Sequence, residues 1–528
     1  MSAAESRDPL AWLEQLFLAH PSRVFLKTLA GQVIRYDELD IESRRMAAAL
    51  TSLGVKSGDR VTVQVEKSPQ VIFLYIACLR LGAIFMPLNT AYTDPELAYF
   101  ISDAEPRVVL VVPEREQTIS SLCDSLSFTK GQRPTVLSID TATAGSFADR
   151  VAQHLIDPRS LSCFAPLASN DVAALVYTSG TTGRSKGAML TRANLAANSR
   201  NLVKAWAFTT NDVLLHALPV FHVHGLFIGV DTVLASGSTL LFLPKFEVEA
   251  VLHALPQSSV MMGVPSFYTR LLGDSRLHRK IVTGLRLFIS GSAPLLPQTH
   301  RDFEARTGHC ILERYGMTET LINSSNPYEG LRRPGSVGRP LPDIEIRIVD
   351  PENGCTLVAQ KAIGLIEVKG ANVFAGYWRA IEKTTASFRP DGFFITGDLG
   401  YLDADGYLYI VGRDKDLIIT GGFNVYPIEI EEAINTLPGV VESAVIGLPH
   451  SDFGEGVVAI VVALGVAQGG SSLTEQAILG ALGSRIAKFK LPKRVLFADD
   501  LPRNAMGKVQ KQQLRNLHAC VFTRSRSE

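Results

Sequence analysis

The sequence has 528 residues, 46% of them hydrophobic and 20% charged, and its 52 lysines and arginines balance 52 aspartates and glutamates. This composition is typical of a globular protein, and the zero net charge excludes a chain-wide electrostatic affinity for nucleic acid or an anionic membrane. The length corresponds to about three or four units of about 150 residues. The six cysteines are scattered without a Cys-x-x-Cys pair, which indicates free thiols and neither a disulfide framework nor a zinc site. We expect a cytoplasmic protein.

Helical and strand patterns alternate along the first half of the chain. We predict helices at residues 37–53 and 68–82, and strands at residues 60–65 and 107–112. Such alternation implies crossover connections and largely parallel sheets.

From residue 364 onward the pattern changes to closely spaced strands. We predict a strand at 364–370, a hairpin at 400–412 that turns at 404–406, a helix beginning at Pro427, strands at 443–447 and 456–464, and a helix at 473–487. This change predicts a domain boundary near residue 412. It divides the chain into an N-terminal domain, residues 1–412, and a small α+β C-terminal domain, residues 413–528.

A loop rich in glycine and hydroxyl side chains is the strongest local motif. A β-rich run leads into Thr178-Ser179-Gly180-Thr181-Thr182-Gly183, and Lys186 follows. Glycines allow close approach of the backbone to a ligand, successive N–H groups can surround an anion, and lysine adds a positive charge. A phosphate is the natural ligand, with a flexible surface loop as the alternative. The motif is not a Walker A loop, because Gly187 follows Lys186.

Residues 177–187 resemble the phosphate loop of the adenylate-forming enzymes, which include acyl-CoA synthetases, luciferases and adenylation domains. Further motifs that resemble this family follow in order at residues 314–319, 396–398, 412–416, 421–431 and 502–508. On these motifs the chain is identified as a member, most similar to the malonyl-CoA synthetases within the family. The resemblance implies an α/β fold: a large N-terminal domain of mixed, mostly parallel sheets with a β-barrel-like subdomain, and a small mobile α+β C-terminal domain.

The resemblance also implies a reaction in two steps. A carboxylate and Mg-ATP give an acyl-adenylate and pyrophosphate, and the thiol of CoA then displaces AMP, so ATP, CoA and Mg²⁺ are the expected co-substrates and cofactor. The first step brings two anions together and requires positive charge at the point of transfer. The resemblance assigns this charge to Lys508, which follows Gly507 on a loop of the C-terminal domain.

Roles for the other residues come from the same resemblance. Glu319 and Thr178 are the expected magnesium ligands, Thr318 is expected to contact the α-phosphate, and His222 to orient pyrophosphate or line the acyl channel. The expected nucleotide-binding residues are Thr178, Ser179, Gly180, Thr181, Thr182, Gly183, Lys186, Ser292, Ala293, Glu313, Arg314, Tyr315, Asp398 and Arg413. Lys415 matches the hinge position, and Gly421, Gly422 and Phe423 match the pantetheine tunnel. Taken singly, Asp398 could form a turn, Tyr315 could be core, and Glu319 could be a solvated acid.

The acid substrate is predicted from an arginine in an apolar strand. Arg286 interrupts residues 285–290, which lead into the Gly291-Ser292-Ala293 segment. A buried unpaired guanidinium is costly, and a second carboxylate would pair with it in a bidentate manner. With Ser266 and His222, Arg286 is therefore predicted to bind a short dicarboxylate, and malonate is the family interpretation. By position alone, a surface arginine at the strand edge is an equal alternative.

Other functions remain open at this point. Methylmalonate is one methyl group larger than malonate and would be poorly discriminated. An adenylation enzyme that loads a carrier protein, a luciferase-like oxygenase and a non-catalytic nucleotide-binding scaffold are further alternatives. A hypothesis on control is that a lysine acetyltransferase and a deacetylase act on Lys508, because acylation would remove its charge.

Overall fold

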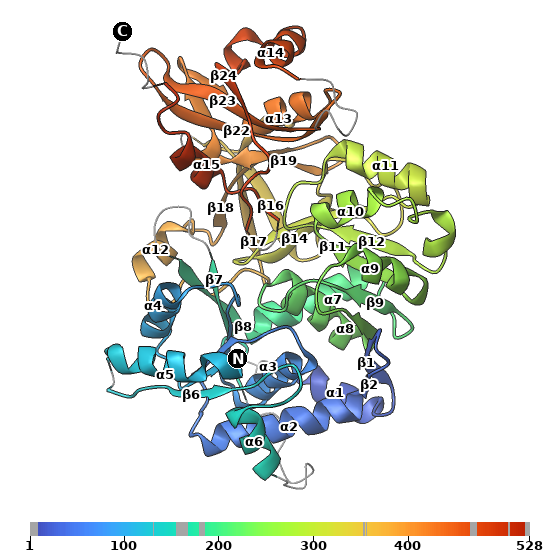
Figure 1. Ribbon diagram of the computed structural model, residues 1–528, viewed down its shortest axis with the longest axis vertical. Helices are drawn as coiled ribbons and strands as arrows, with labels where there is room; N and C mark the ends of the chain where they lie inside the picture. The colour runs from blue at the N-terminus through green and yellow to red at the C-terminus, as the bar shows by residue number, and fades with distance from the viewer. Residues whose placement is uncertain are drawn as a thin grey trace.

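The computed structural model describes residues 9–129, 131–154, 167–178, 185–351, 354, 356–464, 473–504 and 507–522. In this part of the chain four β-sheets are present. Three belong to the N-terminal domain and one to the C-terminal domain, which lies at the opposite end of the molecule from α2 and α6 (Figure 1). The predicted α/β fold with a large N-terminal and a small C-terminal domain is confirmed.

The largest sheet is mixed, with a parallel centre and antiparallel edges. In spatial order its strands are β15 (Arg339–Pro340), β14 (Leu321–Ser325), β13 (Leu312–Met317), β12 (Leu287–Ser290), β11 (Val260–Gly263), β9 (Val213–His216), β10 (Thr239–Phe242), β1 (Val24–Thr28) and β2 (Val33–Arg35). The segments after the carboxyl ends of β11 and β12 carry the predicted residues Ser266, Ser292 and Ala293, and Thr318 and Glu319 follow β13, as expected for an α/β sheet.

The second sheet carries the strands on either side of the phosphate loop. Its order is β6 (Thr135–Ser138), β5 (Val108–Val111), β3 (Arg60–Gln64), β4 (Ile84–Pro87), β7 (Val172–Thr178) and β8 (Lys186–Thr191). The pairing is parallel except between β7 and β8, which are antiparallel and place Thr178 opposite Lys186. The predicted strands at 60–65 and 107–112 are confirmed as β3 and β5.

The remaining two sheets are mainly antiparallel. The predicted barrel-like part contains an antiparallel sheet of β16 (Ile344–Val349), β17 (Gly364–Gly370), β18 (Phe394–Leu402) and β19 (Leu408–Arg413). The C-terminal sheet contains β21 (Phe423–Val425), β20 (Ile418–Thr420), β23 (Gly454–Ala463) and β22 (Val440–His450), and β24 (Arg494–Phe497) pairs in parallel with β23. The predicted strands at 443–447 and 456–464 are thus the two arms of the β22–β23 hairpin.

The helices are α1 (Trp12–Ala19), α2 (Tyr36–Ser52), α3 (Pro69–Leu81), α4 (Asp94–Ala104), α5 (Glu116–Ser125), α6 (Ser146–Gln153), α7 (Arg192–Ala205), α8 (Asp231–Ser236), α9 (Val248–Ala254), α10 (Pro265–Leu272), α11 (Pro297–Thr307), α12 (Ile381–Ala386), α13 (Pro427–Asn435), α14 (Glu475–Gly483) and α15 (Lys511–Leu517). Helix α3 shows why their ends were predictable. Pro69 occupies its first turn, where no N–H partner is needed, and Gly82 ends it with φ of 68°. The predicted helix at 473–487 is shorter, because α14 ends at Gly483.

Alternating side chains of one strand stabilise both faces of the C-terminal sheet. On β23, Val457, Ala459 and Val461 pack against α13 and α14. Val458 and Ile460 belong to the other face, with Leu514 of α15. A strand that is buried on both faces reads as a continuous apolar run, which explains its detection from sequence.

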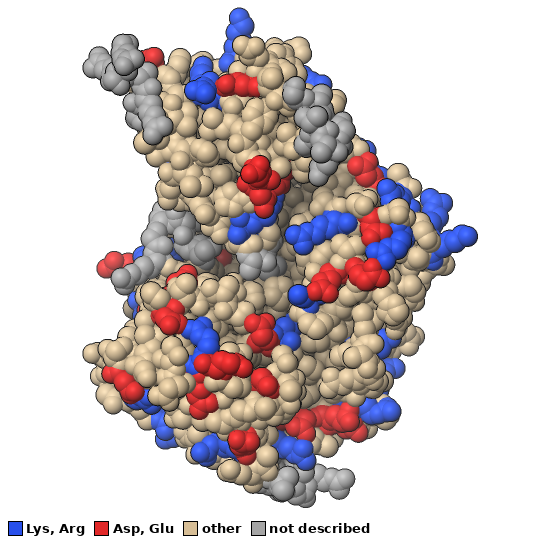
Figure 2. Space-filling view, viewed as in Figure 1, with Lys and Arg blue, Asp and Glu red and all other residues tan. Residues whose placement is uncertain are grey.

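Lysines and arginines are interspersed with aspartates and glutamates on the face in Figure 2, which agrees with the balanced net charge. The same view shows the surface hollowed where the C-terminal domain meets the rest of the molecule. Among the described helices, none combines the length and apolar character that crossing a membrane requires.

Candidate active site

Asp398 and Arg413 form an ion pair on adjacent strands near the domain junction. They are register partners on β18 and β19, and Arg413 Nε lies 2.9 Å from Asp398 Oδ1. Tyr315, on β13, donates a hydrogen bond of 2.5 Å from its hydroxyl to Asp398 Oδ2. Burial raises the pKa of Tyr315 well above its ordinary value, so the phenol keeps its proton and remains a donor. Three predicted nucleotide residues are therefore brought together by three strands.

Lys508 lies close to this group. Its amine interacts electrostatically with Arg413, Asp398 and Lys415. Close packing of protein atoms lowers the pKa of Lys508 to about 8, and the positive charge of Arg413 adds to this effect. The residue as a whole is nevertheless exposed, so water reaching the side chain weakens the shift. Lys508 of the C-terminal domain thus lies near Asp398 of the N-terminal domain and near Arg413 at the boundary between the two domains.

A tight turn holds Lys508 in this place. Its backbone N–H donates to Asn504 Oδ1 at 3.0 Å, and its carbonyl accepts from the N–H of Asn504 at 3.0 Å. Gly507 has φ of 74°, and a Cβ there would lie 3.2 Å from Ser266 Oγ. Glycine thus allows the turn to approach Ser266, a predicted substrate residue at the start of α10, on the N-terminal domain.

Glu319 is linked to the strand after the phosphate loop through an aromatic residue. Tyr377 donates a hydrogen bond of 3.0 Å to Glu319 Oε1, and Lys186 Nζ lies 5.0 Å from the centroid of the Tyr377 ring. Burial raises the pKa of Glu319, so a nearby cation would be favourable. Sequence reasoning missed Tyr377, which lies outside the recognised motifs. The predicted phosphate-loop residues Ser179, Gly180, Thr181, Thr182 and Gly183 lie outside the described residues.

Two histidines and Ser292 meet beside the predicted adenine segment. His224 Nδ1 lies 3.1 Å from Ser292 Oγ, and the N–H of His224 donates to His222 Nδ1 at 3.2 Å. Ser292 has φ of 73°, which is uncommon for a residue with a Cβ and typical of functional turns. Burial of the ring and the charge of Arg314 lower the pKa of His222 to about 4, and burial lowers that of His224 as well. Both imidazoles are therefore neutral at pH 7.

Arg314 is a buried cation next to these neutral rings. Only 4% of its surface is exposed, and its guanidinium lies against the backbone of Gly291, where a Cβ would come within 2.3 Å of Cζ. Nε and Nη2 have no hydrogen-bond partner among the described residues. Burial lowers the pKa of Arg314 to about 9, as expected for a cation removed from water. An anionic ligand would satisfy both free donors.

The structure corrects the prediction for Arg286. Its guanidinium donates to both carboxylate oxygens of Asp212, at 2.8 and 2.9 Å, and to the carbonyls of Trp206 and Ala207. It also precedes β12, whereas the Gly291 segment follows that strand. The prediction that Arg286 binds the substrate carboxylate is wrong, because a partner from the chain itself occupies the guanidinium.

The chain matches the AMP-binding enzyme family over residues 13–378, and the C-terminal domain of AMP-binding enzymes over residues 429–508. It belongs to the AMP-binding enzyme family. This AMP-binding enzyme is 49% identical to MatB from Rhodopseudomonas palustris. The ATP-bound structure of MatB superposes with a TM-score of 0.92 over 98% of this chain and 100% of that one. The apo structure of MatB superposes with a TM-score of 0.81 over 97% of this chain and 99% of that one. The malonate–CoA ligase of Arabidopsis thaliana is 34% identical over 489 residues, 88% of this chain and 78% of that protein.

The Glu313 side chain of this AMP-binding enzyme contacts the Gly335 segment and His300. Its Oε1 accepts the N–H of Gly335 at 3.1 Å and lies 3.5 Å from His300 Nδ1 of α11. Because neighbouring residues of a strand point to opposite faces, Glu313 is directed away from Arg314. These contacts give Glu313 a structural role, and its expected role in nucleotide binding stays a prediction.

The residues predicted to form the hinge and the pantetheine tunnel lie on the C-terminal side of the domain boundary. Lys415 belongs to a short 3₁₀ turn, Asp414–Asp416, which follows β19 directly. Gly421 and Gly422 form the positive-φ turn between β20 and β21, and Phe423 stacks on Phe489 of the same domain at 4.7 Å between centroids. Thr318 and Ala293 are partly buried beside Glu319 and Ser292, respectively.

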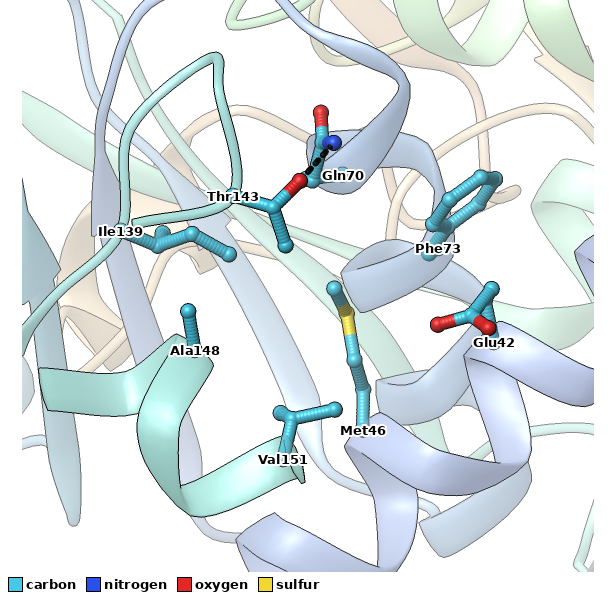
Figure 3. Close-up of a pocket in the computed structure, with 8 residues that line it drawn as sticks. All are labelled: Glu42, Met46, Gln70, Phe73, Ile139, Thr143, Ala148 and Val151. Atoms are coloured by element: carbon cyan, nitrogen blue, oxygen red, sulfur yellow. Dashed lines mark hydrogen bonds between the residues drawn. The ribbon is translucent and has the colours of Figure 1, made fainter. Parts of the chain in front are cut away.

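The N-terminal domain of the AMP-binding enzyme also contains a cavity of about 140 Å³, which is separate from the candidate active site (Figure 3). Its lining consists of Glu42, Met46, Gln70, Phe73, Ile139, Thr143, Ala148 and Val151. Gln70 donates to Thr143 Oγ1 at 2.5 Å, and the other lining residues are mostly apolar (Figure 3). None of the predicted site residues lines this cavity.

Proposed function

We propose that the chain is an AMP-forming acid–CoA ligase that converts malonate, ATP and CoA to malonyl-CoA, AMP and diphosphate. Membership of the AMP-binding enzyme family and 49% identity to MatB support the reaction class. The 34% identity to a malonate–CoA ligase supports the acid. The ATP-bound relative matches better than the apo one, in agreement with the closed position of Lys508.

The observation that supports malonate as the acid is that Nε and Nη2 of Arg314 have no hydrogen-bond partner among the described residues. A monocarboxylic acid uses its one carboxylate for adenylation and would leave Nε and Nη2 without partners. Malonate has a second carboxylate that can pair with both donors, one carbon away from the reacting group. His222 and His224 are neutral and do not compete for this anion. Arg314 thus takes the role that the sequence assigned to Arg286.

The charged residues around the nucleotide account for the adenylation step. Asp398 and Arg413 hold the ribose, and Tyr315 orients the Asp398 carboxylate through its hydrogen bond. The ammonium of Lys508 neutralises the repulsion between the acid carboxylate and the α-phosphate. Lys186, with the loop that precedes it, binds the outer phosphates, and Thr318 contacts the α-phosphate.

We place Mg²⁺ at Glu319, with Thr178, which lies opposite Lys186 in the β7–β8 register, as the second expected ligand. The carboxylate is buried, burial raises its pKa, and a dication would remove the penalty of its negative charge. Mg²⁺ supplies charge neutralisation for the phosphates when it is bound. Tyr377 orients the Glu319 carboxylate through its 3.0 Å hydrogen bond.

Thioester formation, the second half-reaction, requires Lys508 to move away from the acyl-adenylate. We place the boundary between the domains at residues 412 and 413 and the hinge at Lys415, where the 3₁₀ turn separates two sheets. Rotation there would withdraw Lys508 and bring Gly421, Gly422 and Phe423 to the pantetheine arm of CoA.

ATP–pyrophosphate exchange over a panel of acids, followed by thioester assays with CoA, tests the proposal. We expect malonate to be the best acid, with methylmalonate slower. Arg314→Met should lower kcat/KM for malonate by about 100-fold or more, because removing one member of a buried pair costs about 3–5 kcal/mol.

Propionate and the variant Arg286→Met are the controls. Propionate has no distal carboxylate, so Arg314→Met should leave its low activity unchanged, and Arg286→Met should leave the malonate preference intact. Strong exchange with acetate or a fatty acid and none with malonate would overturn the assigned acid. An equal loss for malonate and propionate in Arg314→Met would overturn the role of Arg314.

A further inference from the structure

Three potential metal ligands meet at the end of α11, outside the site described above. His300 and Glu304 lie on this helix, and Cys310 follows it. One ligand atom from each residue lies within 4.8 Å of the others. None of the three belongs to the recognised motifs, and the scattered cysteine spacing did not reveal the cluster.

Local structure explains the convergence. Residues four apart on a helix share one face, which brings Glu304 next to His300. The helix ends at Gly308, whose φ of 81° reverses the chain and brings Cys310 back to that face. The guanidinium of Arg332 holds this segment by donating to the carbonyl of Cys310 at 2.7 Å.

His300 is the member whose environment indicates a missing partner. It is 1% exposed, and neither ring nitrogen has a hydrogen-bond partner within the described part of the chain. Nδ1 lies 3.5 Å from Glu313 Oε1, longer than a normal hydrogen bond. A small adjustment would let Nδ1–H donate to this carboxylate and leave the lone pair of Nε2 for a ligand. Metal-binding histidines commonly have such a carboxylate behind them.

We propose that His300, Glu304 and Cys310 bind a divalent transition-metal ion of the zinc type, separate from the Mg²⁺ that accompanies ATP. Imidazole nitrogen, thiolate sulfur and carboxylate oxygen are the donors that Zn²⁺ takes, and thiolate disfavours Mg²⁺ and Ca²⁺. The thiol proton is released to water as the sulfur–metal bond forms. The charges of thiolate and carboxylate then balance the dication. Glu304 is exposed and Cys310 partly so, which leaves an entry path and room for water as a fourth ligand.

The ion would link the end of α11 to the segment that leads into β13. Bonds of about 2.0–2.3 Å to zinc require the three donors to move closer together, and exposed Glu304 has the freedom to move. Because β13 carries Glu313, Arg314 and Tyr315, the expected effect is stabilisation of this strand and a higher Tm, with no role in the chemical steps.

Co²⁺ binding to the full-length, chelator-treated protein is the direct test. One equivalent of Co²⁺ should produce a near-ultraviolet thiolate-to-cobalt charge-transfer band, and one equivalent of Zn²⁺ should abolish the band and raise the Tm. Cys310→Ser should remove both effects, and Glu304→Gln should weaken binding at least tenfold. Cys520→Ser, at an exposed free cysteine, is the matched control and should behave as the wild type.

Absence of the band at one equivalent in the wild type would overturn the proposal, and so would its persistence in Cys310→Ser. ATP–pyrophosphate exchange by Cys310→Ser should be unchanged. This readout separates the metal site from the proposed ligase activity.

Discussion

Arg286 and Asp212 form a bidentate pair between the start of β12 and the loop before β9, with hydrogen bonds of 2.8 and 2.9 Å. The Asp212 side chain is 4% exposed and also accepts from Ser259 Oγ at 2.7 Å and from the N–H of Thr209 at 2.8 Å. Arg286 is therefore a structural residue that satisfies a buried carboxylate.

Arg286→Met should destabilise the protein without changing its acid preference. The substitution leaves the Asp212 carboxylate buried without its cation and should lower the free energy of unfolding by about 2 kcal/mol. This is less than the ~3–5 kcal/mol of a fully buried pair, because part of Arg286 is exposed. Urea unfolding measures the loss, and malonate kinetics should give an unchanged KM. A selective rise in KM at unchanged stability would contradict the structural role.

The adenylation rate should fall as the pH rises through about 8. Desolvation by the protein atoms packed around the amine and the charge of Arg413 lower the pKa of Lys508 to about 8, and only the protonated amine supplies the required charge. Because the charged form exists below the pKa, adenylation is favoured on the acidic side of 8 and lost on the alkaline side. The pH profile of kcat/KM for pyrophosphate exchange reports this free-enzyme pKa. Lys508→Arg should move the alkaline limit upward, and an unshifted limit in that variant would assign it to another group.

Tyr315→Phe should weaken ATP binding. The change removes the 2.5 Å hydrogen bond to Asp398 but keeps the buried aromatic ring. A hydrogen bond to a charged group contributes about 1.5–3 kcal/mol, so kcat/KM for ATP should fall by about 10- to 100-fold. The KM for malonate should change little. Equal losses for both substrates would show that the substitution disturbs the whole site.

Lys415→Pro should separate the two half-reactions. Proline restricts φ at the 3₁₀ turn between β19 and β20 and should limit rotation of the C-terminal domain. We expect pyrophosphate exchange to be retained, because Lys508 already lies beside Arg413, and thioester formation to fall by at least tenfold. The exchange assay and a CoA-consumption assay on the same preparation measure the two steps. If both steps stay intact, Lys415 is not the hinge.

Much of the fold was predictable because its signals are local. Proline at the start and glycine at the end delimit α3 within one residue, and continuous apolar runs identify β5 and β23. The predicted bounds of β22 and α14 were less accurate, because β22 is longer than the predicted strand and α14 is shorter than the predicted helix. Where these two elements begin and end depends on packing against partners from other parts of the C-terminal domain.

The sequence by itself determined the family, because the motifs combine residue types that phosphate and ribose chemistry require in a set order. The antiparallel hairpin of β18 and β19 also places Asp398 beside Arg413 through local connectivity. The pairing of the buried charges was decided only by the tertiary structure. Arg286 and Arg314 are both arginines in or beside apolar strands. Asp212, 74 residues away, neutralises Arg286, whereas Nε and Nη2 of Arg314, beside Gly291, have no partner in the part of the chain that the structure describes. Which cation is free for a substrate depends on long-range contacts, and a linear pattern does not contain them.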